Sequence, residues 1–85
     1  SDSFYVQLRS SENDVQNIRS ILVQTDNTSV CTATLDGELP TTNIITSDHP
    51  SQLIVNYHCV NQGSTNVTVY ILMENYSATV IRYFS

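Results

Sequence analysis

The residues of this chain with the greatest capacity for chemistry are two cysteines, two histidines and a few carboxylates. A Ser-His-Asp triad would have to use His49 or His58, and the segment 47–50 brings serine, aspartate and histidine together. Neighbours in one turn cannot adopt triad geometry, because the three groups must converge from separate positions. There is no nucleophile-elbow motif, and Gly37 and Gly63 are the only glycines available for a phosphate loop. The sequence therefore predicts a protein that is not an enzyme.

A metal site is also not expected. Cys31, Cys59, His49 and His58 match a Cys2His2 zinc site in number, but no close Cys-x-x-Cys or His-x3-His pair exists. His58 and Cys59 are adjacent on an expected strand, so their side chains point to opposite faces. Segment 36–38 places two carboxylates near a turn, whereas calcium needs six or more oxygen ligands. We expect neither a metal nor a cofactor.

Cys31 and Cys59 fall on the apolar sides of two expected strands. An even number of cysteines in a chain rich in Ser, Thr and Asn indicates an oxidised protein. We expect a disulfide, which the chain-entropy model values at about 3.5 kcal/mol for a loop of this length. The expected location is extracellular, at the cell surface or in the secretory lumen. The alternative is a cytosolic protein with two buried free thiols.

Three asparagines begin the Asn-x-Ser/Thr pattern of N-glycosylation: Asn27, Asn66 and Asn75. All three fall in or beside expected turns, where a glycan could be accommodated. We expect at least one to be modified in a host whose secretory pathway glycosylates asparagine.

The five tyrosines are the residues best suited to recognition, because their rings contact a protein or a glycan at low entropic cost. Tyr57 and Tyr70 share strand faces with apolar residues and are expected in the core. Tyr76 lies in an expected turn, while Tyr5 and Tyr83 are expected on outer faces. If the first and last strands are neighbours, Tyr5, Tyr76 and Tyr83 form a binding patch; otherwise they are scattered over the surface.

Composition limits the partners. The chain has 85 residues, a net charge of −5 and no lysine, and its cations are Arg9, Arg19 and Arg82. Nucleic acids and anionic membranes require clustered Lys or Arg, so neither partner is expected. The longest apolar run, 70–73, is far shorter than a membrane span. The expectation is a single domain, 1–85, excised from a longer protein because it begins without an initiator Met or a signal peptide.

Short β-favouring runs separated by polar turns characterise the whole chain, which is the pattern of an all-β domain. Alternation of apolar and polar residues places Phe4, Val6 and Leu8 on one face, and the same pattern recurs in later segments. The expected strands cover 4–9, 18–25, 29–35, 43–46, 52–60, 66–73 and 78–84. Turns at 62–64 and 74–77 are expected to close hairpins. Seven strands predict an antiparallel two-sheet β-sandwich.

Segment 11–25 is compatible with two structures. Ser11 and Asp14 match a capping box, and Val15, Ile18 and Leu22 recur at helical spacing. A helix near 12–23 would make the fold α+β. The β-branched composition and the alternation within 18–25 favour a strand.

Residues Tyr57-His58-Cys59, Asn61-Gln62-Gly63 and Val67-Thr68-Val69-Tyr70-Ile71 resemble the late hairpin of an immunoglobulin-like domain. In that family a tyrosine two residues before the second cysteine forms the tyrosine corner. The chain departs from antibody domains, since it has no tryptophan and the cysteine spacing is short. The resemblance implies a β-sandwich module of surface or secreted proteins, with Cys31–Cys59 as a bridge between the two sheets.

These observations predict a non-enzymatic recognition or adhesion module that binds a protein or a glycan. One alternative is a structural spacer or assembly subunit without a ligand of its own. Another is a secreted inhibitor or effector that presents one loop, at 36–42 or 47–51.

Overall fold

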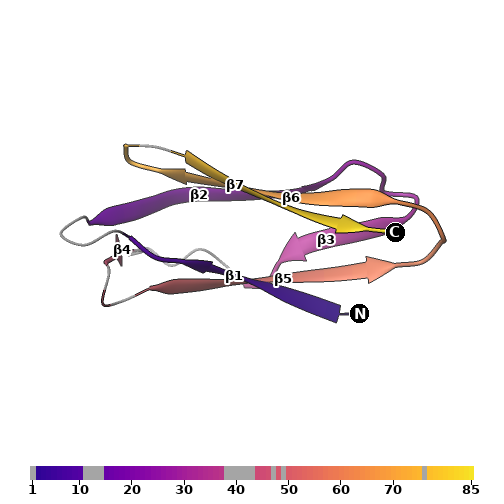
Figure 1. The fold of residues 1–85 in the computed structure, drawn as a ribbon, viewed down its shortest axis with the longest axis horizontal. Helices are drawn as coiled ribbons and strands as arrows, with labels where there is room; N and C mark the ends of the chain where they lie inside the picture. Colours follow the sequence, from indigo (N-terminus) through magenta and orange to yellow (C-terminus); the bar gives the residue numbers. More distant parts are fainter. Residues whose placement is uncertain (1, 11–14, 38–43, 47, 49, 76) are drawn as a thin grey trace.

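The computed structural model describes residues 2–10, 15–37, 44–46, 48, 50–75 and 77–85, and these form an elongated β-sandwich of 45 × 20 × 18 Å (Figure 1). The strands are β1 (Asp2–Leu8), β2 (Gln16–Thr25), β3 (Cys31–Leu35), β4 (Ile44–Ile45), β5 (Ser51–Cys59), β6 (Thr65–Met73) and β7 (Ser77–Phe84). Because β4 has only two residues, each sheet consists of three long strands. The predicted all-β, two-sheet architecture is confirmed.

The two sheets have the strand orders β1-β5-β3 and β4-β2-β6-β7, and every pairing is antiparallel. In Figure 1 the strands β2, β6 and β7 form the upper layer, and β1 and β5 lie in the lower one. Strands β6 and β7 form the expected hairpin, with Leu72 opposite Ser77. The expected hairpin at 62–64 is wrong, because β5 and β6 belong to different sheets and this segment crosses between them.

Strand β2 resolves the ambiguity of the N-terminal third. Residues 16–25 pair with β6 along nearly their whole length, so the alternative helix near 12–23 is wrong. A register shift between Ile18 and Ser20 marks a β-bulge at Arg19. The bulge explains why the sequence was ambiguous: Ile18 and Ile21, three residues apart as in a helix, both pack toward the core from a strand. Residues 11–14 lie outside the described part of the chain.

The core lies between the sheets and consists of alternate residues from each long strand. In β6 the burial pattern alternates along the strand, with odd-numbered positions inside. The buried core residues are Phe4, Val6, Leu8, Ile18, Leu53, Val55, Val67, Val69, Ile71 and Met73. Because successive side chains of a strand point to opposite faces, this pattern fixes which residues remain for the two outer faces.

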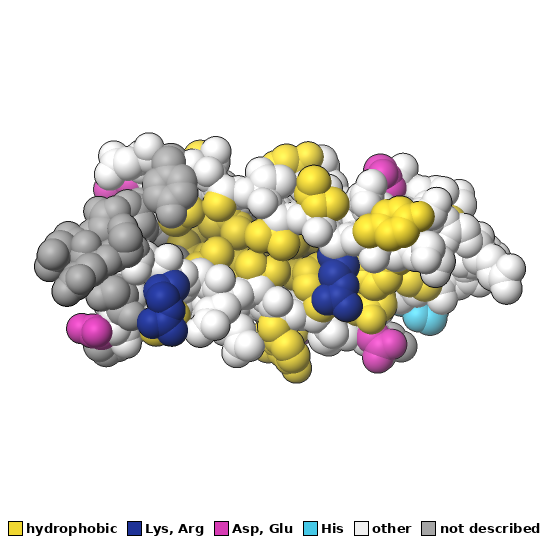
Figure 2. Space-filling model, in the orientation of Figure 1, with side chains coloured by type: hydrophobic (Ala, Val, Ile, Leu, Met, Phe, Trp, Pro, Cys, Tyr) yellow, Lys and Arg dark blue, Asp and Glu magenta, His cyan; other side chains and the backbone are white. Residues whose placement is uncertain are grey.

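An aromatic cluster joins the layers at the end of the molecule where both termini lie. The rings of Tyr57 and Phe84 are 4.6 Å apart, and that of Phe4 lies 6.0 Å from Tyr57 and 6.4 Å from Phe84. The guanidinium carbon of Arg82 lies 5.3 Å from the Phe4 ring centroid and 5.7 Å from that of Phe84. Figure 2 shows a band of hydrophobic side chains between the two layers. Arg82, on the edge strand β7, thus places a charge against that band, which disfavours pairing with another edge.

Within the part of the chain that the structure describes, no helix has the length and apolar character needed to span a membrane.

Candidate functional site

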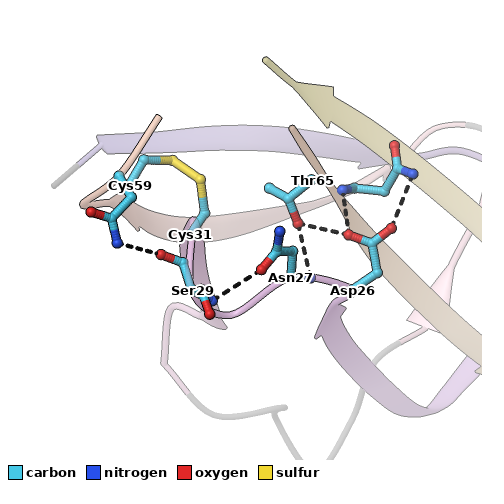
Figure 3. Close-up of a disulfide and its surroundings, with 8 residues drawn as sticks. Asp26, Asn27, Ser29, Cys31, Cys59 and Thr65 are labelled. Carbon is cyan, nitrogen blue, oxygen red and sulfur yellow. Dashed lines mark hydrogen bonds between the residues drawn. A yellow bond between two sulfur atoms is a disulfide. The ribbon is translucent and has the colours of Figure 1, made fainter. Parts of the chain in front are cut away.

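Cys31 and Cys59 form a disulfide that joins adjacent strands at one end of the sandwich (Figure 3). The two residues are direct partners in the β3–β5 register, with an S–S distance of 2.01 Å. The predicted bridge is confirmed. Its implied position between the two sheets is wrong, because β3 and β5 belong to one sheet. Cys31 is buried and Cys59 is exposed.

A polar network next to the disulfide holds the end of β2 against the start of β6 (Figure 3). The Asp26 carboxylate accepts hydrogen bonds from the Asn66 backbone N–H at 2.9 Å and from the Thr65 hydroxyl at 2.7 Å. The Thr65 hydroxyl oxygen in turn accepts from the Asn27 backbone N–H at 3.1 Å. Chiefly because of the Asn66 backbone bond, and then that from Thr65, the pKa of Asp26 is lowered from its ordinary value. The network therefore supports the structure more strongly when Asp26 is ionised.

Asp26→Asn is expected to remove a pH-dependent part of the stability. Since the pKa of Asp26 is lower in the folded protein, the unfolded chain binds more protons in the acidic range. The stabilisation is fully present above the ordinary pKa of 3.8 and is lost as the pH falls through the folded value. Urea unfolding between pH 2 and pH 6 is expected to show a difference from wild type that shrinks below about pH 4.

Asp36→Asn makes the same change in net charge on an exposed residue outside this network and is the control for the Asp26 experiment. A difference between wild type and Asp26→Asn that stays constant from pH 2 to pH 6 would contradict the role of the ionised carboxylate.

A hollow of about 660 Å³ opens beside the disulfide. It is lined by Val30, Cys31, Cys59, Asn61, Gln62, Gly63, Ser64, Tyr83, Phe84 and Ser85. Gly63 has a positive φ of 140°, and a Cβ there would lie 2.9 Å from the Val30 side chain, so glycine allows the crossover to pass close to the core. Amide and hydroxyl side chains in this lining can form hydrogen bonds with a neutral polar group.

The three glycosylation sequons occupy different environments. The Asn27 side-chain oxygen accepts a hydrogen bond from the Ser29 backbone N–H, which makes an Asx turn in an exposed loop. Asn66 lies within β6, and its amide donates to Asp26 at 3.3 Å. Asn75 is exposed in the β6–β7 turn. Asn27 and Asn75 are therefore more open to modification than Asn66, which pairs with Tyr83 across the sheet.

Tyr5 and Tyr83 do not lie together as the expected patch requires. Tyr5 and Tyr83 are exposed, by 63% and 62%, as predicted. However, β1 and β7 belong to different sheets, and the two side chains lie on the outer faces of opposite layers. Tyr57 packs against the core as expected, whereas Tyr70 is 43% exposed, so its expected core position is wrong. Tyr76 lies outside the described residues.

The position of Tyr70 reveals a surface that the sequence did not predict. Five large apolar side chains lie on the outer face of the β2-β6-β7 sheet, and we call them the apolar stripe: Leu22, Tyr70, Leu72, Ile81 and Tyr83. Leu22 is the direct cross-strand partner of Tyr70. Ile81 pairs with Thr68, the next outward residue of β6, so it is the diagonal neighbour of Tyr70. Together the five side chains cross the sheet obliquely from β2 to the end of β7.

No charged side chain projects from this face between Ser20 and Tyr83 in the described strands. The face consists of the apolar stripe together with Ser20, Gln24, Asn66, Thr68, Ser77 and Thr79, and Arg19 lies beside it in the bulge. The outer face of the opposite sheet is different. Apart from Tyr5 and the half-buried Ile54, its outward residues are Ser3, Gln7, Thr32, Thr34, Gln52, Asn56 and His58. Thus only one of the two faces presents several large apolar groups, and the Asp26 carboxylate borders it at Asn66.

Among the described residues, His, Cys, Asp and Glu side chains form no group of three that could hold a metal ion. His58 is exposed on the outer face of β5, opposite Thr32. His49 and segment 38–43 lie outside the described residues, and so does most of the candidate loop 36–42. The arrangement that the described residues support is therefore a contact surface and an uncharged hollow.

A comparison with protein-family models, curated proteins and solved structures finds no match to this chain. The site is accordingly defined by its own geometry. One sequence signal could have identified the stripe: in 66–73 all outward positions after Thr68 are apolar, and an outward face of a solvated strand is normally polar.

Proposed function

We propose that this domain is a non-enzymatic recognition module that binds a protein partner through the apolar stripe. The observation that carries the proposal is the exposure of five large apolar side chains on one uncharged sheet face. The largest apolar patch on a soluble monomer typically covers about 300–600 Å² and is often an interaction site. The opposite face provides the internal comparison, since it has the polar composition of a face in contact with water.

The chemistry of the stripe favours a protein over a glycan. Recognition of a sugar combines an aromatic platform with several hydrogen-bonding groups, whereas Leu22, Leu72 and Ile81 offer only apolar contact. A partner surface with apolar residues and no buried charge would gain the most free energy from covering this face, because no charge would lose its solvation.

The proposed compartment is extracellular, cell-surface or luminal. The Cys31–Cys59 disulfide supports it, because such bonds persist in oxidising environments. In this setting we assign glycans to Asn27 and Asn75. A glycan on Asn66 would cover the Tyr83 end of the stripe, since the two residues are cross-strand partners. The likeness to immunoglobulin-like modules contributes only the layered architecture to this proposal.

The experiment uses the domain biotinylated at one terminus and multimerised on streptavidin, with a glycan array and a panel of purified extracellular protein domains that includes this domain itself as probes. We expect binding to a protein of the panel that falls at least tenfold in Tyr83→Ser. Tyr5→Ser is the matched control, because the two tyrosines are equally exposed on opposite faces.

Equal loss of binding in Tyr5→Ser and Tyr83→Ser, or no loss in either, would refute the role of the stripe. Binding to glycans alone would refute the protein partner.

A further inference from the structure

We propose that the partner that covers the apolar stripe is a second copy of this chain, packed face to face about a two-fold axis. This inference rests on the function proposed above and specifies its partner. It follows from the area of the stripe and from its arrangement on the sheet, and the charge of the chain provides a test of it.

The area of the face matches the requirement of a modest dimer. With roughly half of each side chain exposed, five side chains of this size present on the order of 500 Å² of accessible surface. Two copies would bury about 1,000 Å² from the stripes alone, and stable interfaces begin at about 1,200 Å² in total. Thr68, Thr79 and Gln24, which lie among the stripe residues, would supply the remainder.

The oblique course of the stripe makes it self-complementary. Its two ends are Tyr83 on β7 and the pair Leu22 and Leu72 on β2 and β6, with Tyr70 and Ile81 between them. A two-fold axis in the interface plane, perpendicular to the stripe at its centre, superposes the stripe on itself. Tyr83 of each copy then meets the leucine end of the other copy. The small side chains of Ser77 and Thr79 beside the stripe leave space for the larger ones to interdigitate.

Charge distinguishes a second copy from a basic partner. The chain has a net charge of −5. Asp26 borders the Tyr83 end of the stripe, where its carboxylate accepts a hydrogen bond from the Asn66 side chain, and Glu74 lies two residues past Leu72 at the other end. Two copies repel each other over long range, while the five side chains of the stripe bring no charge into the contact. Salt screens that repulsion, so self-association is expected to tighten as ionic strength rises. Binding of a basic protein would weaken under the same change.

The test is sedimentation equilibrium of the whole 85-residue domain over a range of concentrations, at 50 mM and at 500 mM NaCl. We expect a reversible dimer whose dissociation constant falls at the higher salt concentration. Tyr83→Ser is expected to raise that constant at least tenfold, and Leu22→Ser is expected to do the same from the other end of the stripe. Tyr5→Ser is expected to leave the constant within twofold of wild type, and circular dichroism of each variant confirms that it is folded.

A dimer that weakens equally in Tyr5→Ser, or that neither stripe variant weakens, would overturn the inference because another surface would then hold the copies together. A wild-type domain that remains monomeric at millimolar concentration would also overturn it. In that case the binding experiment with the protein panel tests the proposed function separately. Tyr83-dependent binding to a different protein would preserve that function, and its absence would remove both.

Discussion

Replacement of both Cys31 and Cys59 by alanine is expected to lower the free energy of unfolding by about 3.5 kcal/mol. The bridge links residues 28 apart in sequence, so its loss lets the unfolded chain sample many more conformations. A domain of this size has a total stability on the order of 5 kcal/mol, and the variant should be largely unfolded at elevated temperature. Urea unfolding monitored by circular dichroism measures the difference.

The neighbouring cross-strand pair supplies the control for the disulfide variant. Thr32 and His58 are direct partners in the same register and lie exposed on the outer face. Their double replacement by alanine changes the same two strands without removing a covalent link, and should cost less than about 1 kcal/mol. Equal losses in the two double variants would show that strand pairing, and not the cross-link, provides the stability. Reduced wild-type protein should behave like the cysteine variant.

Ile71→Ala is expected to lower the free energy of unfolding by about 2–5 kcal/mol. Ile71 in β6 is 0% exposed and contributes to the core between the sheets. Its truncation removes buried apolar area and leaves a cavity that the neighbouring side chains fill only in part. Chemical unfolding of the purified variant, compared with wild type at a concentration where both are monomeric, measures the effect.

The next residue along β6 is a matched control. Leu72 belongs to the apolar stripe and is 49% exposed, so Leu72→Ala is expected to change monomer stability by only about 0.5 kcal/mol. The two variants together test the assignment of faces, because Ile71 and Leu72 differ mainly in the direction of their side chains. A large loss of monomer stability in Leu72→Ala with a small one in Ile71→Ala would reverse that assignment.

Much of the fold follows from local alternation. Alternation correctly predicts that Phe4, Val6 and Leu8 share one buried face. A strand has a period of two residues, and this period can be recognised in the sequence without knowing which strands lie beside it. Which strands pair with one another cannot be predicted from local alternation. The segment 62–64 has the composition of a hairpin turn, yet it crosses between sheets, since turn residues specify a local bend and not which strands pair.

The same limit explains the errors at the site. The cysteines indicated a bridge, but its placement between the sheets depended on the immunoglobulin-like strand order, whereas here β1 and β3 both flank β5 in one sheet. Tyr70 was expected in the core because it shares a face with Leu72. That argument identifies residues on one face correctly but cannot determine whether an apolar face is covered by the protein itself or left for a partner. The opposite face of β6, with Val67, Val69, Ile71 and Met73, is more apolar than the face of Tyr70 and Leu72, and it packs in the core.

The central claim is that a partner covers the apolar stripe when the protein is in its native setting. Hydroxyl-radical footprinting with mass spectrometry tests it directly, by comparing dilute isolated domain with protein labelled on or released from the source cells. We expect Tyr70 and Tyr83 to be modified severalfold less in the native material, while modification of Tyr5 stays the same. If Tyr70 and Tyr83 are modified as fast in the native material as in the isolated domain, as is expected of Tyr5, the stripe faces water and the account is contradicted.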